Sequence, residues 1–193
     1  NRPLRAGKGT IYEGGIRVCA CATWPGRIPA GTTVKEPMHA VDWYPTLLRL
    51  AGASVGAKND SPQLPVDGLD VWPMLTQGAT SPHDAILLAG MAPSRMALRM
   101  GDWKLLLNAN EPTARAGAAE KVELYNLAED IGESKDLAAS QPERVKQMRA
   151  RLETFLKEAV PPGGPTEPAP AVAKKKAGVQ KKAGAQKKGV QKR

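Results

Sequence analysis

Residues 96–107 read MALRMGDWKLLL. Two mostly apolar runs flank the pair Gly101-Asp102, a two-residue loop with glycine in the first place, which is typical of a tight β-hairpin turn. The stretch therefore predicts two adjacent antiparallel strands joined at this pair. We expect the second half of the chain to be built around that hairpin.

The runs on either side of the hairpin extend the predicted sheet. AILLAG at 85–90 and KVELYNL at 121–127 are short, apolar and bounded by turn residues, which indicates further strands. Residues 108–120 are rich in Ala, Asn and Gly and are expected to form a surface loop.

Residues 140–160, SQPERVKQMRARLETFLKEAV, carry the clearest helical pattern. Pro142 and Glu143 suit the first turn of a helix. Six apolar side chains recur at helical spacing and predict one docking face: Val145, Met148, Leu152, Phe155, Leu156 and Ala159.

The first half of the chain predicts fewer elements. IRVCACATW at 16–24 is apolar and suits a buried strand, which would make Cys19 and Cys21 buried strand cysteines. VDWYPTLLRLAG at 41–52 indicates a helix, and VWPMLTQG at 71–78 indicates one helical turn. In the longer helix we expect Asp42 as N-cap, Gly52 as stop and an apolar stripe of Leu47, Leu48 and Ala51.

The positive charge is concentrated at one end of the chain. Nine of the 28 Lys and Arg residues lie in 174–193, which leaves 19 to balance the 19 Asp and Glu residues in the rest of the chain. A Pro-, Gly- and Ala-rich linker at 161–173 precedes this basic segment, and we expect 161–193 to be disordered. The sequence contains no run of about 18 apolar residues, so it predicts no membrane span.

Residues 7–15, GKGTIYEGG, hold the best candidate for chemistry. Lys8 stands between two glycines, which allow close approach of a ligand, and an ammonium group suits an oxyanion such as sulfate or phosphate. Spacing alone favours a solvated loop lysine, and the stretch lacks the full phosphate-loop pattern. Glu13 and Arg17 are four residues apart and are interpreted as a structural ion pair.

Five stretches in order carry a resemblance to a known family. They are PLRAGKGTIYEGGIRV, HAVDWYPTLLRLAG, DGLDVWPML, ALRMGDWKLL and ELYNLAEDIGESKDLA. From about Pro3 to about Val160 the chain resembles the C-terminal half of the arylsulfatase-type sulfatases, within the alkaline-phosphatase-like superfamily. The resemblance implies that Lys8 contacts the sulfate oxygens of a substrate and stabilises charge there.

The same resemblance assigns secondary roles to neighbouring residues. Thr10, Glu13, Gly14, Gly15 and Arg17 match the family's stretch and are expected to shape the substrate site. His39 and Asp42 match the start of a family helix, and we interpret both as structural, in packing or capping.

The resemblance also implies cofactors that this chain does not supply. Sulfatases use a formylglycine, made from Cys or Ser in a C/S-x-P/A-x-R context, and a divalent cation, usually calcium. Cys19 and Cys21 both lack the required Arg, so neither is a credible precursor. Asp67 and Asp70 are too few ligands for calcium, and we expect no metal site in this chain.

The sequence thus predicts an α/β fold: the late part of an alkaline-phosphatase-like sheet domain at 1–80, a small C-terminal antiparallel sheet packed by a helix at 81–160, and a disordered basic tail at 161–193. The expected function is sulfuric ester hydrolysis by a longer protein of which this chain is an N-terminally truncated, inactive portion. Sulfated glycans are candidate substrates, and export to the periplasm or outside the cell is favoured by the resemblance.

Two alternatives stay open at this point. One is a phosphonate or phosphate ester hydrolase of the same superfamily. The other is a noncatalytic module that binds polyanions weakly through 174–193, where a flexible basic segment without aromatic residues favours salt-dependent, sequence-independent contacts.

Overall fold

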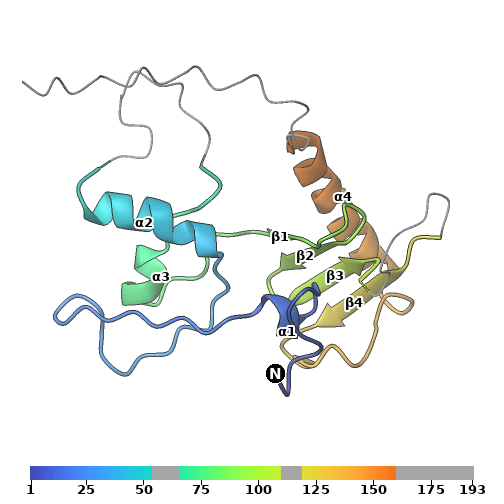
Figure 1. The fold of residues 1–193 in the computed structure, drawn as a ribbon, viewed down its shortest axis with the longest axis horizontal. Coiled ribbons are helices and arrows are strands. Elements are labelled where there is room, and N and C mark those ends of the chain that lie inside the picture. The colour runs from blue at the N-terminus through green and yellow to red at the C-terminus, as the bar shows by residue number, and fades with distance from the viewer. Residues whose placement is uncertain (54–65, 110–118, 160–193) are drawn as a thin grey trace, which may run out of the picture. The chain divides into compact units, whose positions relative to one another are not determined.

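A computed structural model describes residues 1–53, 66–109 and 119–159 of the chain. The predictions for 161–193 and for most of the 108–120 loop lie outside the described residues. In chain order the described elements are α1 (Glu13–Ile16), the 3₁₀ turn η1 (Ala40–Asp42), α2 (Trp43–Leu50), α3 (Trp72–Gln77), β1 (Ile86–Ala89), β2 (Met96–Met100), β3 (Trp103–Leu107), β4 (Val122–Asn126) and α4 (Pro142–Glu158), as Figure 1 shows.

The four strands form one antiparallel sheet in the order β1-β2-β3-β4, so each strand pairs with its neighbour along the chain. The hairpin expected at Gly101-Asp102 is confirmed, with Met100 opposite Trp103. Gly101 has a φ of 55°, a left-handed conformation that glycine adopts with little strain. The other two predicted strands are confirmed as β1 and β4, shortened by one residue at each end.

Alternate residues of the strands enter two separate cores, one on each side of the sheet. Leu98, Leu105 and Leu124 are fully buried and sit opposite one another across three strands. They face α4, which contributes Met148 and Leu152 to the same cluster. Each such buried side chain stabilises the fold by roughly 1.5–3 kcal/mol relative to an exposed one.

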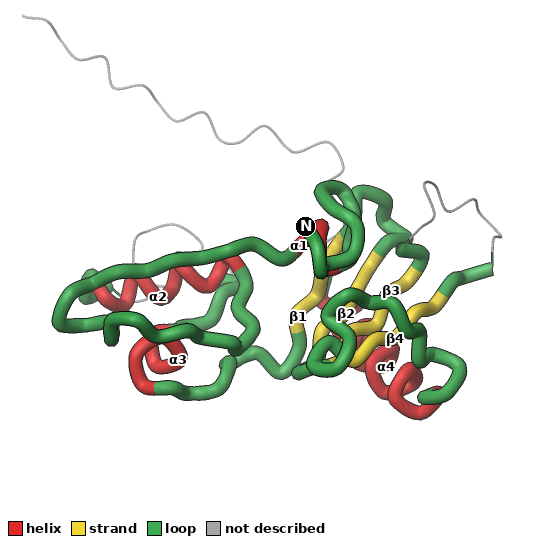
Figure 2. Tube along the Cα trace, turned by 90° about the horizontal axis from the view of Figure 1, so that it is seen from below, coloured by secondary structure: helices red, strands yellow, loops and turns green. Residues whose placement is uncertain are grey.

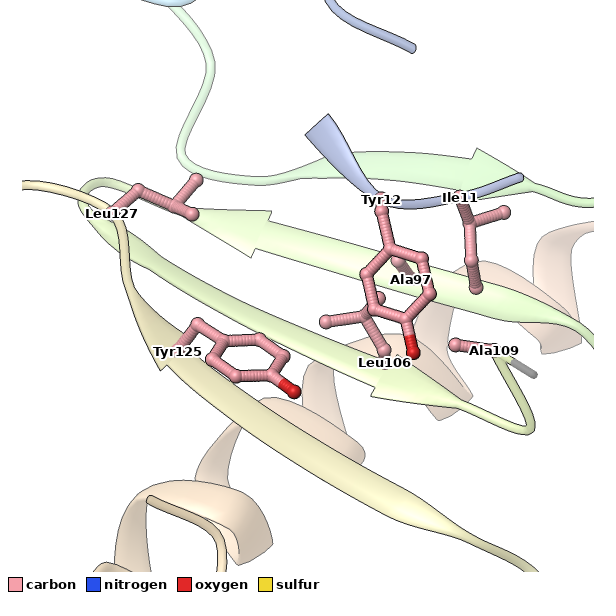
Figure 3. Packing of buried hydrophobic residues seen from close by; sticks show 7 residues of the cluster. All are labelled: Ile11, Tyr12, Ala97, Leu106, Ala109, Tyr125 and Leu127. Atoms are coloured by element: carbon pink, nitrogen blue, oxygen red, sulfur yellow. The ribbon is translucent and has the colours of Figure 1, made fainter. Parts of the chain in front are cut away.

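The opposite face of the sheet is covered by the beginning of the chain. Ile11 and Tyr12 pack on Ala97, Leu106 and Tyr125, all of them buried, and Figure 3 shows these side chains together. In Figure 2, α1 and α4 lie on opposite sides of the strands. The segment that holds Lys8 is therefore fastened to the sheet by its own apolar neighbours.

Helix α4 confirms the expected helix and most of its apolar face. Met148 and Leu152 are buried, and Val145 and Phe155 pack partly buried against the same cluster. Leu156, 42% exposed, and Ala159, past the end of the helix, are the exceptions. Their part of the prediction is wrong, since neither residue belongs to the cluster between α4 and the sheet.

The expected strand at 16–24 is wrong. Ile16 ends α1, and residues 17–24 have no regular secondary structure and are exposed. Val18 is 81% exposed, and both Cys19 and Cys21 are exposed rather than buried. An apolar run becomes a buried strand only when a sheet pairs with it, and the described residues offer this run no partner strand.

Helix α2 is confirmed, but its apolar stripe is not. Leu47 is 56% exposed and Ala51 is exposed, whereas Pro45 and Thr46 are the buried residues. The helix buries the face that carries Thr46, whose hydroxyl accepts a hydrogen bond from the N–H of Val71 at 3.0 Å. The expected stop is confirmed, since Gly52 follows the helix with a φ of 77°.

Candidate functional site

Lys8 stands at the tip of a tight turn. The N–H of Thr10 donates to the carbonyl of Gly7 at 3.2 Å, and the Thr10 hydroxyl donates to the same oxygen at 2.8 Å. Gly9 has a φ of 89°, as the third position of a type II turn requires. The Lys8 side chain is exposed, and its ammonium group makes no hydrogen bond or ion pair with the described residues. It is therefore available to an anion from solution.

The Gly14-Gly15 pair allows this turn to lie directly on α1. A Cβ added at Gly14 would stand 2.3 Å from the Arg5 carbonyl oxygen, and one at Gly15 would stand 2.2 Å from that of Thr10. Both distances are shorter than real Cβ contacts, so only glycine fits. The N–H of Gly14 also donates to the Arg5 carbonyl at 2.9 Å. The two glycines thus hold the Lys8 turn in place by close backbone contact.

Glu13 points away from the surface, into a buried ionic cluster. Its carboxylate accepts from the ammonium group of Lys104 on β3 at 2.9 Å, and its other oxygen lies 3.5 Å from the guanidinium of Arg17. The structural ion pair expected between Glu13 and Arg17 is confirmed. Glu13 is 2% exposed and Lys104 is fully buried.

Glu133 completes the cluster from the loop after β4. One of its carboxylate oxygens accepts from Lys104 at 2.8 Å, and the other accepts from the backbone N–H of Glu13 at 2.7 Å. Glu133 is fully buried, and burial raises its pKa above the ordinary value although the charge of Lys104 acts in the opposite direction.

A second polar network lies beside the first. The hydroxyls of Tyr12 and Tyr125 both donate to the Glu123 carboxylate, at 2.9 and 2.6 Å. The guanidinium of Arg5 donates to the Tyr125 hydroxyl at 2.8 Å and lies 4.0 Å from the centre of the Tyr12 ring. Burial, and then the hydrogen bonds to Glu123, raise the pKa of both tyrosines far above its ordinary value. Both rings thus remain neutral donors over the physiological range.

Sequence reasoning did not find Lys104, Glu123 or Glu133. Lys104 and Glu123 occupy strand positions whose side chains face the same core as Leu106 and Tyr125. A charged residue at such a position is a detectable signal, because a buried charge needs a partner of opposite charge. The partner itself comes from distant parts of the chain, and that pairing is visible only in three dimensions.

His39 and Asp42 are structural, as interpreted from sequence. The Asp42 carboxylate accepts from the backbone N–H of His39 at 2.6 Å and that of Leu69 at 3.0 Å, and it lies 2.9 Å from His83 Nε2. Asp42 occupies the N-cap position of α2, but its side chain makes no capping bond to that helix. The expectation of a capped α2 is wrong in this respect, because Asp42 joins η1, Leu69 and His83 instead.

No group of three or more His, Cys, Asp or Glu side chains that could hold a metal ion occurs in the described part of the chain. Asp70 is paired with Arg49 at 2.5 Å and accepts from the N–H of Trp72 at 3.0 Å. The described residues therefore offer no ligand set for the family's calcium.

A hollow of about 780 Å³ borders the buried cluster. Glu13 and Arg17 line one side of it, and residues 32–40 and β1 line others. Lys8 does not line it. The lysine turn and the hollow are thus separate features that share the α1 segment.

The arrangement can present one positive charge to an anion. Lys8 supplies an exposed ammonium group on a turn whose backbone is held by close contacts, and an ammonium group is suited to the oxygens of a sulfate or phosphate ester. None of the carboxylates of the cluster is exposed enough to serve as a base for a substrate at that turn.

Characterised proteins share sequence with most of this chain. Arylsulfatase J of Mus musculus is 30% identical over an alignment that covers 83% of this chain and 33% of that protein. For arylsulfatase A of Homo sapiens the identity is 32%, with 76% of this chain and 32% of that protein covered. The chain thus spans about a third of the length of these relatives. No family model matches the chain.

Solved structures show the same fold. The crystal structure of Ps i-CgsB in complex with k-i-k-neocarrahexaose aligns with a TM-score of 0.64 and 33% sequence identity. The alignment covers 80% of this chain and 32% of that one. Within the described residues, no helix is both long and apolar enough to cross a membrane.

Proposed function

Because this chain belongs to the sulfatases, where it corresponds to a C-terminal portion, we propose that the whole protein hydrolyses a sulfate ester and that Lys8 contacts the sulfate group. The observation that supports this role is the exposed ammonium group of Lys8 at the tip of a turn fixed by Gly9, Gly14 and Gly15. Because contacts hold the backbone of this turn before a substrate arrives, only the Lys8 side chain has to become ordered when it meets the sulfate.

Lys8 would act electrostatically. The sulfuryl oxygens gain or redistribute charge as the ester bond breaks, and an ammonium group beside them lowers the energy of that state. Thr10, Glu13, Gly14, Gly15 and Arg17 would shape the site. In the structure Thr10, Glu13 and the glycines act on the position of the turn, which supports a shaping role rather than direct contact with substrate.

The test is replacement of Lys8 by alanine in the native polypeptide that carries residues 1–193. We expect kcat/KM for an aryl sulfate to fall by about 100-fold to 1000-fold, the loss typical of one oxyanion-stabilising group. This chain spans about a third of the length of its relatives, and we propose that it is inactive alone, so the assay needs the native polypeptide.

The matched control is Lys146→Ala, which removes an exposed lysine from α4 on the other side of the sheet. Its kcat/KM should remain within about twofold of the unchanged protein, as for a surface substitution away from the site. Wild-type turnover by Lys8→Ala would overturn the role of Lys8.

In the alternative reaction, hydrolysis of a phosphonate or phosphate ester, Lys8 would contact the substrate from the same turn. An ammonium group is a point charge that binds sulfate and phosphate oxygens alike, so Lys8 does not separate the two reactions. A comparison of aryl sulfate with aryl phosphate and phosphonate hydrolysis by the native polypeptide separates them. The sulfatase proposal requires the sulfate ester to have the highest kcat/KM.

A sulfated glycan is the substrate class we propose. Ps i-CgsB, which resembles this chain in fold and sequence, was solved with k-i-k-neocarrahexaose, and this supports a carbohydrate ester. The nine basic residues of 174–193 favour weak, salt-dependent binding of a polyanion by the same protein. Calcium and formylglycine are implied for the family by the arylsulfatase relatives, and export from the cytoplasm is part of this proposal.

A further inference from the structure

We propose that Lys104 and Glu133 are positioning residues that hold the Lys8 turn in its working geometry by fixing the first residue of α1. The inference rests on the proposed function of Lys8, since a position matters only if the lysine meets a substrate. The chain of contacts runs from strand β3 and the loop after β4, through Glu13 and the two glycines, to the turn itself.

The first contact is a side-chain cap supplied from a distant part of the chain. Helix α1 has Tyr12 at its N-cap position, and that side chain makes no capping bond. Glu133 supplies the acceptor instead, at 2.7 Å from the Glu13 N–H. An unpaired N–H buried at this position would cost about 1–3 kcal/mol, so Glu133 determines where the turn of α1 can lie.

The second contact fixes Glu133 and Glu13 relative to each other. The ammonium group of Lys104 donates to Glu133 at 2.8 Å and to Glu13 at 2.9 Å, and it is fully buried. Two carboxylates at such short range would repel each other without the positive charge between them. Lys104 is anchored on β3, so it ties both carboxylates to the rigid sheet.

The third contact transmits this position to Lys8. Gly14 and Gly15 directly follow Glu13, and their missing Cβ atoms leave room for the carbonyls of Arg5, Ala6, Gly7 and Thr10. A shift of α1 would therefore move the backbone on both sides of Lys8. Because the backbone of Gly14-Gly15 is in direct contact with the backbone of residues 5–10, the two segments have little room to move independently.

Glu133 is itself held in an uncommon backbone conformation. Its φ is 50°, in the left-handed region, and its N–H donates to the carbonyl of Asp130 at 3.1 Å. The Asp130 carboxylate accepts from the N–H groups of Ser134 and Lys135, both at 2.8 Å. Strained backbone of this kind persists where surrounding contacts over-determine it, often near functional sites. The loop is thus built to aim the Glu133 carboxylate at α1.

The first test is amide hydrogen exchange on this chain with Glu133→Gln. Lys104 and the Glu13 N–H bind different oxygens of Glu133, and glutamine replaces one of these oxygens by an NH2 donor, so one of the two hydrogen bonds is lost in this geometry. We expect exchange at the amides of Glu13, Gly14 and Thr10 to accelerate about tenfold or more, while the amides of β2 and β3 keep their rates. Unchanged exchange at these three amides would overturn the proposal.

Two further variants keep this test decisive. Glu153→Gln makes the same chemical change at an exposed position of α4, and it should leave every exchange rate near the turn unchanged. If Glu133→Gln does not fold, Lys104→Met/Glu133→Gln removes one charge of each sign and leaves Glu13 paired with Arg17. The same three amides should then exchange faster.

The second test separates positioning from general stability by a double-mutant cycle in the native polypeptide. If Glu133 acts through Lys8, Glu133→Gln should lower kcat/KM for an aryl sulfate about tenfold alone but have little further effect when Lys8 is already alanine. An equal loss in both backgrounds would make Glu133 merely structural. If Lys8→Ala alone has no effect, the proposed function fails, whereas the exchange result still decides whether Glu133 holds the turn.

Discussion

Lys104 shows how one residue can have two interpretations. In sequence it stands between Trp103 and three leucines, where a lysine on an antiparallel strand would ordinarily face water. In the structure it is fully buried and donates to two carboxylates. A buried ammonium group is stable only when it is paired and hydrogen-bonded, so this position depends on residues 91 and 29 positions away in the chain.

The raised pKa of Glu133 predicts a pH-dependent stability. A carboxyl group that holds its proton more tightly in the folded state contributes stability that is fully present below the unfolded pKa, near 4.5, and is lost as pH rises through the folded pKa. We therefore expect the free energy of unfolding of the unchanged protein, relative to Glu133→Gln, to fall as pH rises above about 4.5. Urea unfolding at a series of pH values measures it.

Asp130 provides a control of opposite sign. Burial alone would raise its pKa, but the N–H groups of Lys135 and Ser134, with the Ser134 hydroxyl, outweigh burial and lower it. The stability of the unchanged protein relative to Asp130→Asn should therefore rise with pH over the acid range. A rise with pH for Glu133→Gln as well would mean that Lys104 outweighs burial at Glu133.

At the scale of the element, α4 is the part in which sequence pattern and structure agree best. Its buried residues recur at four-residue spacing, from Met148 to Leu152, and they meet leucines that alternate along the strands. A helical stripe and a strand alternation are local patterns, and both identify the face that meets the core.

We expect Leu152→Ala to destabilise the protein by about 2–5 kcal/mol, because it leaves a cavity between α4 and the sheet. Leu156→Ala is the matched control on the same helix, since Leu156 is 42% exposed against 2% for Leu152. Its cost should be about 1 kcal/mol or less. Thermal and urea unfolding measure both, and equal losses would contradict the docking of α4 by its Leu152 face.

The segment 16–24 shows the opposite outcome. Its apolar pattern is that of a buried strand, yet Val18 is exposed and no described strand pairs with it. Strand formation depends on neighbours more than helix formation does, because the hydrogen bonds of a strand come from another strand. The apolar pattern shows that the segment could be buried as a strand. Whether it is buried depends on a neighbouring strand, which the described residues do not provide.

At the scale of the whole molecule, residues 1–159 form one compact unit. The beginning of the chain and the C-terminal sheet share a core at Tyr12 and Tyr125 and a buried cluster at Glu13 and Lys104. The division at residue 80 that the resemblance suggested stays a prediction. The ionic cluster at Glu13 nevertheless joins residues from both sides of that division.

The basic end of the chain gives a prediction at this scale. Removal of residues 161–193 takes away nine basic residues and Glu167, which lowers the formal net charge of the chain from +9 to +1. We expect binding to dextran sulfate at low salt to weaken about tenfold or more, and the binding of the full chain to fall steeply with added salt. Uncharged dextran is the control polymer, and unchanged binding of dextran sulfate after truncation would contradict a role for this segment.

The sequence by itself determined the elements whose signals are local. Gly101-Asp102 closes the hairpin, the strands flank it, and the spacing of apolar residues on 140–160 gives a helix, because turn geometry and periodicity act over a few residues. The order of five motifs in the sequence also indicated the family, and it indicated Lys8 as the candidate residue for sulfate contact.

Only the tertiary structure decided what surrounds Glu13, five residues after Lys8. The Glu13 side chain points inward and pairs with Arg17 and with Lys104 of β3, and its N–H donates to Glu133 from the loop after β4. It also decided that 16–24 is exposed and that α2 buries Thr46 rather than Leu47. Burial and charge pairing join residues that are far apart in the chain, and local sequence patterns carry no record of which distant residue will supply the partner.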